Sequence, residues 1–240
     1  MRYGKVHKGF VRSIIVIDSP GCSWANCKFC AVHQQVADGS TALQQIEEVR
    51  DHIPQGEQTL QIVSGASFND YSDKVQAAIL LLAMDKGIGT LILEQRSEFR
   101  YKIPPLNKFA KDRGFKIEWI IGLESISRED RDFLGKEPID SNYYNLSHVY
   151  QHVNILYGHP TKSFKILKKE ISKLLEWYRT VTINIYEPPT GSTIHRDQEK
   201  VEELYSSAEF QEWLKDERVD IQDSDPRAQS DFGGIDTFER

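Results

Sequence analysis

The residues best suited to chemistry in this chain are its three cysteines, the only ones among 240 residues. Cys22, Cys27 and Cys30 fall within nine positions, in the sequence PGCSWANCKFC. Thiols at such short intervals on a loop are typical ligands of iron–sulfur clusters or of zinc. Three thiolates can hold a four-iron cluster and leave one iron without a protein ligand. A small molecule can bind and be cleaved at such an open iron.

The spacing Cys-x4-Cys-x2-Cys leaves a second interpretation open. His33 follows closely, and three thiolates with one imidazole complete the tetrahedron that a structural zinc ion prefers. A structural zinc usually staples a small module that lacks a core, whereas these cysteines follow the apolar run 14–17 of a large domain. This position favours the cluster, and a zinc-stapled α/β binding protein without redox chemistry is the alternative.

The elements that must position these cysteines alternate between strand and helix patterns. Apolar, β-rich runs predict six strands, and apolar residues at helical spacing predict the helices between them. The predicted strands are 12–19, 59–64, 89–94, 116–123, 149–157 and 181–186. The predicted helices are 40–52, 72–86, 104–113, 127–134, 163–178 and 201–214.

Six strands that each lead into a helix or a loop imply a parallel sheet covered on both faces. Right-handed crossovers curl such a sheet, and six units rather than eight predict an α/β fold of the partial (β/α)6 barrel type. We expect residues 1–196 to form this barrel. We expect residues 197–240 to form a short acidic extension, helical at 201–214 and irregular from residue 220. Function should lie at the carboxyl ends of the strands, where every unusual motif of the chain falls.

Composition narrows the class of protein. Hydrophobic residues make up 39% and charged residues 28% of the chain, which allows a sizeable core. No apolar stretch is long enough to span a membrane and no signal peptide is evident, so we expect a cytoplasmic protein without a membrane partner. In that compartment clustered thiols are metal ligands rather than disulfides.

The net charge of −6 is unevenly distributed along the chain. Residues 197–240 contain 14 acidic and 5 basic side chains, which leaves 22 acidic and 25 basic ones before them. A mildly basic body with an acidic end is compatible with a nucleic-acid substrate but does not indicate one.

The cysteine segment resembles the cluster loop of the radical S-adenosylmethionine (SAM) superfamily, whose usual spacing is Cys-x3-Cys-x2-Cys with an aromatic residue before the last cysteine. Phe29 is that aromatic here, and one extra residue separates Cys22 from Cys27. The resemblance implies a [4Fe–4S] cluster, SAM chelated by the open iron, and Phe29 near the adenine. It also implies reductive cleavage of SAM to a 5′-deoxyadenosyl radical. An external donor such as flavodoxin or ferredoxin would supply the electron.

Ser64 and Gly65 follow the second strand and resemble the superfamily's Gly-Gly-Glu element, whose backbone receives the amino group of SAM. The acidic residue of that element is missing here, and Asn69 or Asp70 is a candidate to replace it. Read without the resemblance, the segment is an ordinary glycine turn that ends a strand.

Glu94 and Arg96 follow the third strand and resemble the Glu-x-Arg element of the branch that contains elongator-type and archaeosine-pathway proteins. A carboxylate suits an ammonium or ribose hydroxyls, and Arg suits the SAM carboxylate. Glu124 and Ser125 follow the fourth strand and resemble the Gly-x-Glu-Ser region near the SAM ribose, with Lys136 downstream. The alternatives are an ion pair at the barrel rim for Glu94 and Arg96, and a helix N-terminal carboxylate for Glu124.

Gly158 lies in a segment that follows the fifth strand and resembles the one whose backbone approaches the adenine. The region after the sixth strand turns toward the substrate in that branch, so Asn184, Tyr186 and His195 are the substrate-side candidates. The archaeosine-pathway resemblance implies a modified nucleobase or tRNA as substrate, although this chain is short and has no evident RNA-binding appendage. A degenerate family member that binds the cofactors without cleaving SAM is a third hypothesis.

Overall fold

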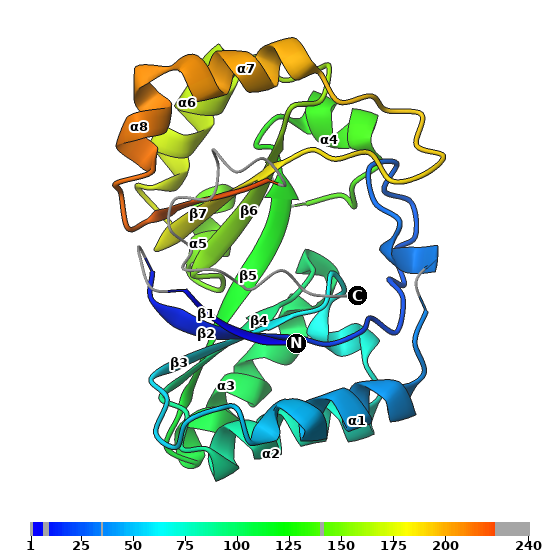
Figure 1. Ribbon diagram of the computed structural model, residues 1–240, viewed down its shortest axis with the longest axis vertical. Coiled ribbons are helices and arrows are strands. Elements are labelled where there is room, and N and C mark those ends of the chain that lie inside the picture. Colours follow the sequence, from blue (N-terminus) through cyan, green and yellow to red (C-terminus); the bar gives the residue numbers. More distant parts are fainter. Residues whose placement is uncertain (1, 7–9, 35, 140–141, 224–240) are drawn as a thin grey trace.

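The computed structural model describes residues 2–6, 10–34, 36–139 and 142–223. Eight strands form one sheet in the order β1 to β8, so that strands adjacent in sequence are adjacent in space. The sheet curls into an open half-barrel (Figure 1). Strands β2 to β8 are parallel, and β1 pairs with β2 in the antiparallel sense. The strands are Tyr3–Val6 (β1), Arg12–Val16 (β2), Thr59–Val63 (β3), Thr90–Glu94 (β4), Lys116–Glu124 (β5), His152–Tyr157 (β6), Thr180–Ile185 (β7) and Val219–Gln222 (β8).

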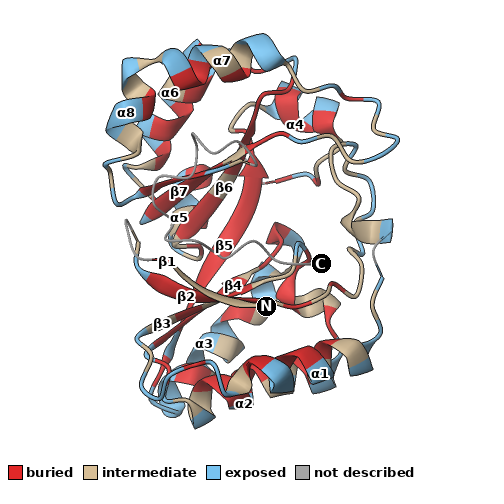
Figure 2. Cartoon of the chain, viewed as in Figure 1, coloured by how far each residue is buried: buried red, intermediate tan, exposed pale blue. Residues whose placement is uncertain are grey.

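Helices cover the outer side of this sheet and bury the faces that they turn toward the strands (Figure 2). No helix in the described ranges is long and apolar enough to cross a membrane. The α-helices are Gly39–Arg50 (α1), Asp73–Asp85 (α2), Ile103–Asp112 (α3), Arg128–Leu134 (α4), Tyr143–Ser147 (α5), Phe164–Leu174 (α6), Gln198–Ser206 (α7) and Ala208–Trp213 (α8). Short 3-10 helices are Val32–Gln34 (η1), Phe68–Asp70 (η2) and Ser97–Lys102 (η3).

Local sequence explains why the helices begin where they do. Asp38 caps α1 by accepting a hydrogen bond from the Thr41 backbone, and Ser163 caps α6 in the same way. Such caps satisfy backbone N–H groups that have no partner within the helix. The buried residues of α6 recur at helical spacing, as expected of a helix that packs on a sheet with one face.

The predicted α/β partial barrel is confirmed, because the six predicted strands correspond to β2 through β7. Two more strands extend the sheet beyond the predicted six. β1 has four residues and no strong apolar run, and β8 was expected to be irregular. β8 forms because Val219 and Ile221 are buried in the core while Asp220 pairs with Arg12 inside the barrel.

The single helix predicted at 201–214 is wrong. Ser207 interrupts it with an extended backbone (φ −80°, ψ 154°). Its side chain accepts a hydrogen bond from the Phe210 backbone and caps the start of α8. Residues 197–222 thus add two helices and a parallel strand to the barrel. The rest of the predicted acidic extension, 224–240, lies outside the described residues.

The amino-terminal ends of the strands enclose a network of buried charged side chains, which we call the floor. Arg12 donates to Asp220 at 2.7 Å and to Gln61 at 2.5 Å, which links β2 to β8 and to β3. His152 on β6 contacts Glu118 on β5 at 3.0 Å. These contacts cross the inside of the half-barrel and hold its strands together opposite the end where the cysteines lie.

Candidate functional site

A cavity of about 380 Å³ lies at the carboxyl ends of the parallel strands. All three cysteines line it, together with residues that end β3 through β7 or follow them. In Figure 1 the cysteine segment runs along one side of the molecule, and the loop after β7 approaches it there. The strand-end rule that predicted the position of the site therefore holds for this cavity.

The cysteine loop is attached to the segment that ends α4. The Lys28 N–H donates to the Leu134 carbonyl at 2.9 Å, and the Trp24 indole donates to the Gly135 carbonyl at 2.9 Å. Gly135 has a φ of 68°, and a Cβ at this position would collide with the Asn26 carbonyl. Only glycine suits this close approach, so the loop and the segment after α4 are held in one fixed arrangement.

The environment of the thiols suits ligands of a metal cluster. The Arg96 guanidinium donates to Cys22 Sγ at 3.0 Å, and the Val32 N–H donates to Cys30 Sγ at 3.4 Å. Burial raises the pKa of the Cys27 thiol to about 12 and also raises that of Cys30. Thiols with raised pKa values remain protonated near neutral pH, so bound metal is what would hold them as thiolates.

The arrangement differs from a site for one metal ion. A mononuclear zinc site brings its donor atoms around a single point. Among the described residues, no three His, Cys, Asp or Glu side chains are placed to hold one metal ion. In a four-iron cluster each thiolate binds a different iron, so the three sulfur atoms need not converge in that way.

Arg96 is engaged by acidic side chains of the protein itself. Its guanidinium contacts Asp70 at 2.7 Å and Glu98 at 2.5 Å, and it also donates to Ser23 in the cysteine loop at 2.5 Å. Burial lowers the pKa of Arg96, but these carboxylates outweigh it and raise the pKa. The carboxylate of Asp70 is therefore already paired. Arg96 anchors the cysteine loop through its contacts with Cys22 and Ser23.

Three of the carboxylates that line the cavity and one ammonium lie beside the cysteines, and we call them the acidic cluster: Glu94, Glu124, Lys136 and Glu137. The fourth carboxylate of the lining, Glu187, is exposed and pairs with Arg196 at 2.8 Å. Lys136 Nζ lies 3.3 Å from Glu124 Oε1 and 3.4 Å from Glu137 Oε2. Burial raises the pKa of Glu94 to about 7, opposed by the charge of Lys136 and reinforced by Glu124. Burial lowers the pKa of Lys136, but Glu124 and Glu137 outweigh it and raise the pKa.

The backbone at Glu124 has a left-handed conformation that residues other than glycine rarely adopt. Its φ is 62°, and the register between β5 and β6 shifts at this point. The buried Lys162 holds the strained residue by donating to the Glu124 carbonyl at 2.7 Å and to Glu170 at 2.7 Å. Strained backbone of this kind is found at functional sites, where the surrounding structure fixes it.

The other wall of the cavity is apolar and aromatic. Phe29 packs against a small cluster made by Leu134, Leu156, Tyr186 and Ile194. The hydroxyl of Tyr186 donates to the Ile194 carbonyl at 3.1 Å, and the ring itself is nearly fully buried. Phe29, which is only partly buried, is the ring of this wall that offers surface to a planar ligand, and the Tyr186 hydroxyl is already used inside the protein.

Several residues named from the sequence line the cavity together: Cys22, Cys27, Cys30, Phe29, Gly65, Glu94, Arg96, Glu124, Asn184 and Tyr186. Four others lie outside its lining. Ser64 hydrogen bonds within its own turn, and Ser125 donates to Glu170 at 2.6 Å beneath the site. Gly158 packs under Val201 of α7, and His195 is exposed.

Sequence reasoning missed Glu137 and the supporting Lys162. Glu137 ends no strand and lies beyond α4, and its burial depends on the approach of Gly135 to the cysteine loop. Lys162 begins a lysine-rich segment that looks like a solvated helix face, yet its side chain is fully buried against Glu170. A lysine directly before a helix N-cap was the available signal, and it is a weak one.

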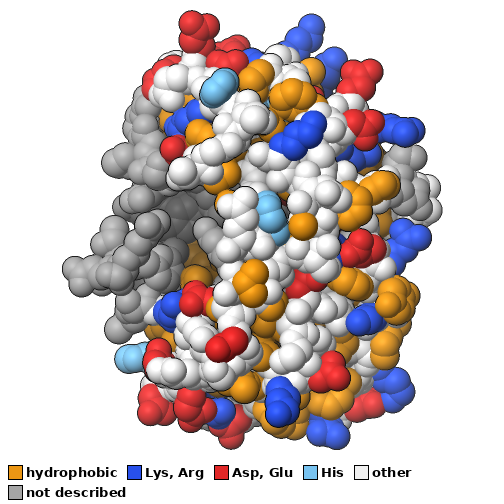
Figure 3. All heavy atoms as spheres, turned by 90° about the vertical axis from the view of Figure 1, so that its right-hand side faces the viewer, with side chains coloured by type: hydrophobic (Ala, Val, Ile, Leu, Met, Phe, Trp, Pro, Cys, Tyr) orange, Lys and Arg blue, Asp and Glu red, His pale blue; other side chains and the backbone are white. Residues whose placement is uncertain are grey.

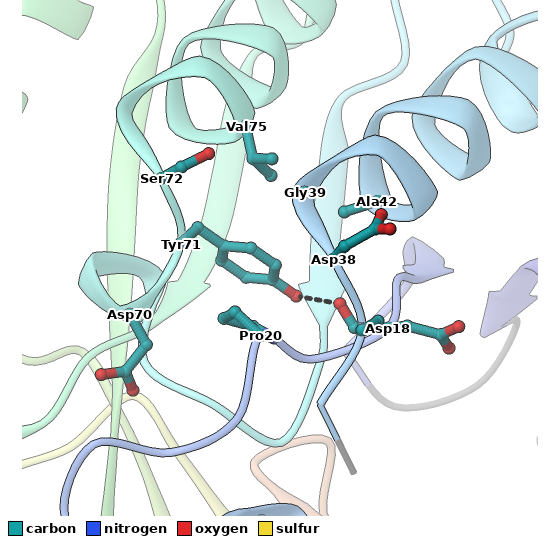
Figure 4. Close-up of a pocket in the computed structure, with 10 residues that line it drawn as sticks. Asp18, Pro20, Asp38, Gly39, Ala42, Asp70, Tyr71, Ser72 and Val75 are labelled. Atoms are coloured by element: carbon teal, nitrogen blue, oxygen red, sulfur yellow. Dashed lines mark hydrogen bonds between the residues drawn. The ribbon is translucent and has the colours of Figure 1, made fainter.

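A second cavity, of about 310 Å³, lies behind the cysteine loop at the N-terminal ends of α1 and α2 (Figure 4). Tyr71 points across it and donates to the Asp18 carbonyl at 3.1 Å. The carboxylate of Asp18 is paired with Arg2, that of Asp38 caps α1, and that of Asp70 is paired with Arg96. The three carboxylates that line this cavity therefore already have partners within the protein, and they hold the start of the cysteine loop in place.

Comparison with solved structures places the fold. A queuine lyase from Clostridium spiroforme bound to SAM and queuine matches with a TM-score of 0.83 and 22% sequence identity, over 97% of each chain. The chain has the fold of this lyase. The cobalamin-dependent S-adenosylmethionine radical enzyme OxsB matches 82% of this chain and 30% of its own, with 14% identity and a TM-score of 0.39. No protein-family model matches the sequence, and no curated protein matches it significantly.

Proposed function

We propose that the chain is a radical SAM enzyme whose [4Fe–4S] cluster is held by Cys22, Cys27 and Cys30. One observation carries the proposal: all three thiols line a single cavity at the carboxyl ends of the parallel strands, with charged groups beside them. When bound, such a cluster supplies one electron for the reductive cleavage of SAM. The chain's own contribution is to fix the cysteine loop, orient SAM and exclude water.

The lining of the cavity supports specific roles in SAM binding. Gly65 offers backbone groups at the end of β3, and Glu94 and Glu124 offer carboxylates at the ends of β4 and β5. Phe29 lies in the apolar wall, where it suits an adenine ring. Arg96 supports the loop through Cys22 and Asp70, so we assign it a positioning role.

We propose a modified nucleobase as the substrate class. The fold likeness to a lyase whose structure contains queuine supports this, and Asn184 of β7 and Tyr186, directly after β7, line the cavity on the side of its aromatic wall. On the face shown in Figure 3, the Lys and Arg side chains of the described residues are interspersed with Asp and Glu and form no continuous basic patch. This supports a free base in preference to tRNA, which is bound largely through its phosphates.

Anaerobic reconstitution with iron and sulfide tests the proposal. We expect about four irons per chain, and release of 5′-deoxyadenosine when SAM and a reductant or reduced flavodoxin are added. Cys27→Ala should lose the cluster and SAM cleavage together, while circular dichroism shows a retained fold. A colourless protein with one zinc per chain would establish the zinc-stapled alternative. A cluster that binds SAM and never cleaves it would indicate the degenerate family member.

A further inference from the structure

Among the residues that the structure describes, Glu137 is the buried carboxylate whose oxygens both lack a hydrogen-bond donor. The residue is 2% exposed, and neither of its side-chain oxygens accepts a hydrogen bond from the described chain. Its nearest charge is the Lys136 ammonium, 3.4 Å away, which also contacts Glu124. Glu137 is one of the residues that line the cavity containing the cysteines, so a ligand that enters this cavity comes close to its carboxylate.

The charges around Glu137 do not balance within the protein. The acidic cluster places three carboxylates against the single ammonium of Lys136. Arg96 is the other cation in the lining, and Asp70 and Glu98 already pair with it. The cavity therefore has an excess of carboxylate beside the cysteines, and it is suited to a ligand that brings positive charge.

The position of Glu137 is built rather than accidental. Gly135, two residues before it, has a left-handed backbone pressed against Asn26, and Leu134 accepts from the Lys28 N–H. These contacts fix the segment against the cysteine loop. A buried carboxylate without donors costs folding free energy, so a rigid placement of this kind implies a partner that arrives with the ligand.

We propose that Glu137 binds an ammonium group of the ligand in this cavity. The inference rests on the proposed function and deepens it by assigning a ligand group to one residue. Two molecules could bring this group: SAM, through its α-ammonium, or a substrate that carries an amine, as queuine does in its side chain. In either case the ammonium supplies the hydrogen bonds that the two oxygens of Glu137 lack, and it offsets the excess of carboxylate.

The test uses the isosteric variant Glu137→Gln in the anaerobically reconstituted protein. Glu129→Gln, an exposed position on α4, is the matched control. Equilibrium dialysis measures the affinity of four probes: SAM, S-adenosylhomocysteine, 5′-methylthioadenosine, and queuine in the presence of SAM. S-adenosylhomocysteine keeps the α-ammonium without the sulfonium charge, and 5′-methylthioadenosine lacks the amino-acid part.

Two results support the proposal, and they distinguish the sources. Weaker binding of SAM and S-adenosylhomocysteine by about tenfold or more, with 5′-methylthioadenosine unchanged, assigns Glu137 to the SAM ammonium. Unchanged binding of all three, with queuine weaker by about tenfold or more, assigns it to the substrate amine. Glu129→Gln should leave all four affinities at their wild-type values.

The proposal is overturned if Glu137→Gln binds every probe as the wild type does. It is also overturned if the variant fails to assemble the cluster while remaining folded, because Glu137 would then act on the cysteine loop. A wild-type protein that assembles no cluster and binds no SAM would count against the proposed function instead. Iron content and circular dichroism of each protein separate these cases.

Discussion

Two regions inside the half-barrel contain buried charges, and they differ in how these charges are partnered. At the floor, Arg12 is bound to Asp220, Gln61 and the Phe10 carbonyl, and these contacts connect three strands. At the opposite end, the acidic cluster shares one ammonium among three carboxylates. The buried charges at the amino-terminal end of the sheet are thus fully paired, whereas those of the acidic cluster at the carboxyl-terminal end are not.

Glu118 shows how completely the floor is partnered. It receives hydrogen bonds from Lys116 at 2.7 Å, Arg179 at 2.6 Å and His152 at 3.0 Å, and the other ring nitrogen of His152 contacts Thr180 at 2.7 Å. Burial raises the pKa of Glu118, but these partners outweigh it and lower the pKa to about 2. The floor therefore favours charged carboxylate.

The carboxyl-terminal end has the opposite character. Within the described chain, the buried side-chain atoms that lack a hydrogen-bond partner are both oxygens of Glu137 and Nε2 of His159. His159 follows β6, and Glu137 lines the cavity, so both lie at the carboxyl-terminal end of the sheet. The difference teaches that the amino-terminal end is organised for stability and the carboxyl-terminal end for ligands.

The largest effect should come from breaking the floor. Arg12→Ala leaves the Asp220 carboxylate buried without its cation, and we expect the free energy of unfolding to fall by about 3–5 kcal/mol. Urea unfolding monitored by circular dichroism measures this loss. The double variant Arg12→Met with Asp220→Leu removes both charges and should recover most of it. A loss below about 1 kcal/mol in Arg12→Ala would contradict a stabilising role for the floor.

The sequence predicted the strands that are long and apolar and missed those that depend on tertiary contacts. β5 and β6 read as strands from their own residues, because each is buried along nearly its whole length. β8 has four residues, and the buried pair of Asp220 with Arg12, 208 positions away, is part of what fixes it. Local patterns contain no information about a contact over that separation.

The same limit applies to the site. Cys22, Glu94 and Glu124 were named because each lies at the end of a predicted strand or shortly after one, where parallel sheets gather their functional side chains. Glu137 was missed because it follows a helix, and its burial arises from the fit of Gly135 against the cysteine loop. Ser125 was named as a ligand contact, but its hydroxyl is used by Glu170 under the site. The roles of Cys22, Glu94 and Glu124 in binding the cluster and SAM stay predictions.

Acid should weaken the floor through Glu118. Its pKa in the folded protein is about 2, below the ordinary value of 4.5. The stabilising contribution is complete above pH 4.5 and is lost as the pH falls toward 2, by about 3 kcal/mol in total. Urea midpoints should fall as the pH is lowered from 4.5 to 3. Glu118→Gln should flatten this dependence, and an unchanged slope in the variant would contradict the assignment.

The acidic cluster should show the opposite dependence through Glu94. Burial raises its pKa from 4.5 to about 7, so the folded protein binds more protons than the unfolded chain between these values. The contribution of Glu94 to stability therefore decreases as the pH rises from 4.5 to 7. In the protein without cluster or SAM, Glu94→Gln should remove this decrease. If the difference in stability between variant and wild type is the same at pH 5 and pH 7, the assignment is wrong.

The smallest effect on stability should come from replacing Glu137. A Glu→Gln substitution can be made at Glu137 in the acidic cluster and at Glu118 in the floor, so the two ends can be compared directly. Glu118→Gln removes a charge on which three cationic or hydrogen-bonding partners depend, and it should lower the free energy of unfolding by about 1–3 kcal/mol. Glu137→Gln removes a charge without donors, and Lys136 keeps Glu124 as its partner. We expect a change within about 0.5 kcal/mol in the cofactor-free protein.

Urea unfolding of the two variants at pH 7 checks this pair directly. Equal losses at both positions would mean that Glu137 is held by the protein as firmly as Glu118, and the contrast between the two ends would not stand. A neutral Glu137→Gln has a further consequence, because any loss of ligand affinity in that variant then reflects a missing contact and not a weakened fold. Stability and ligand binding would then be separable at the carboxyl-terminal end of the barrel.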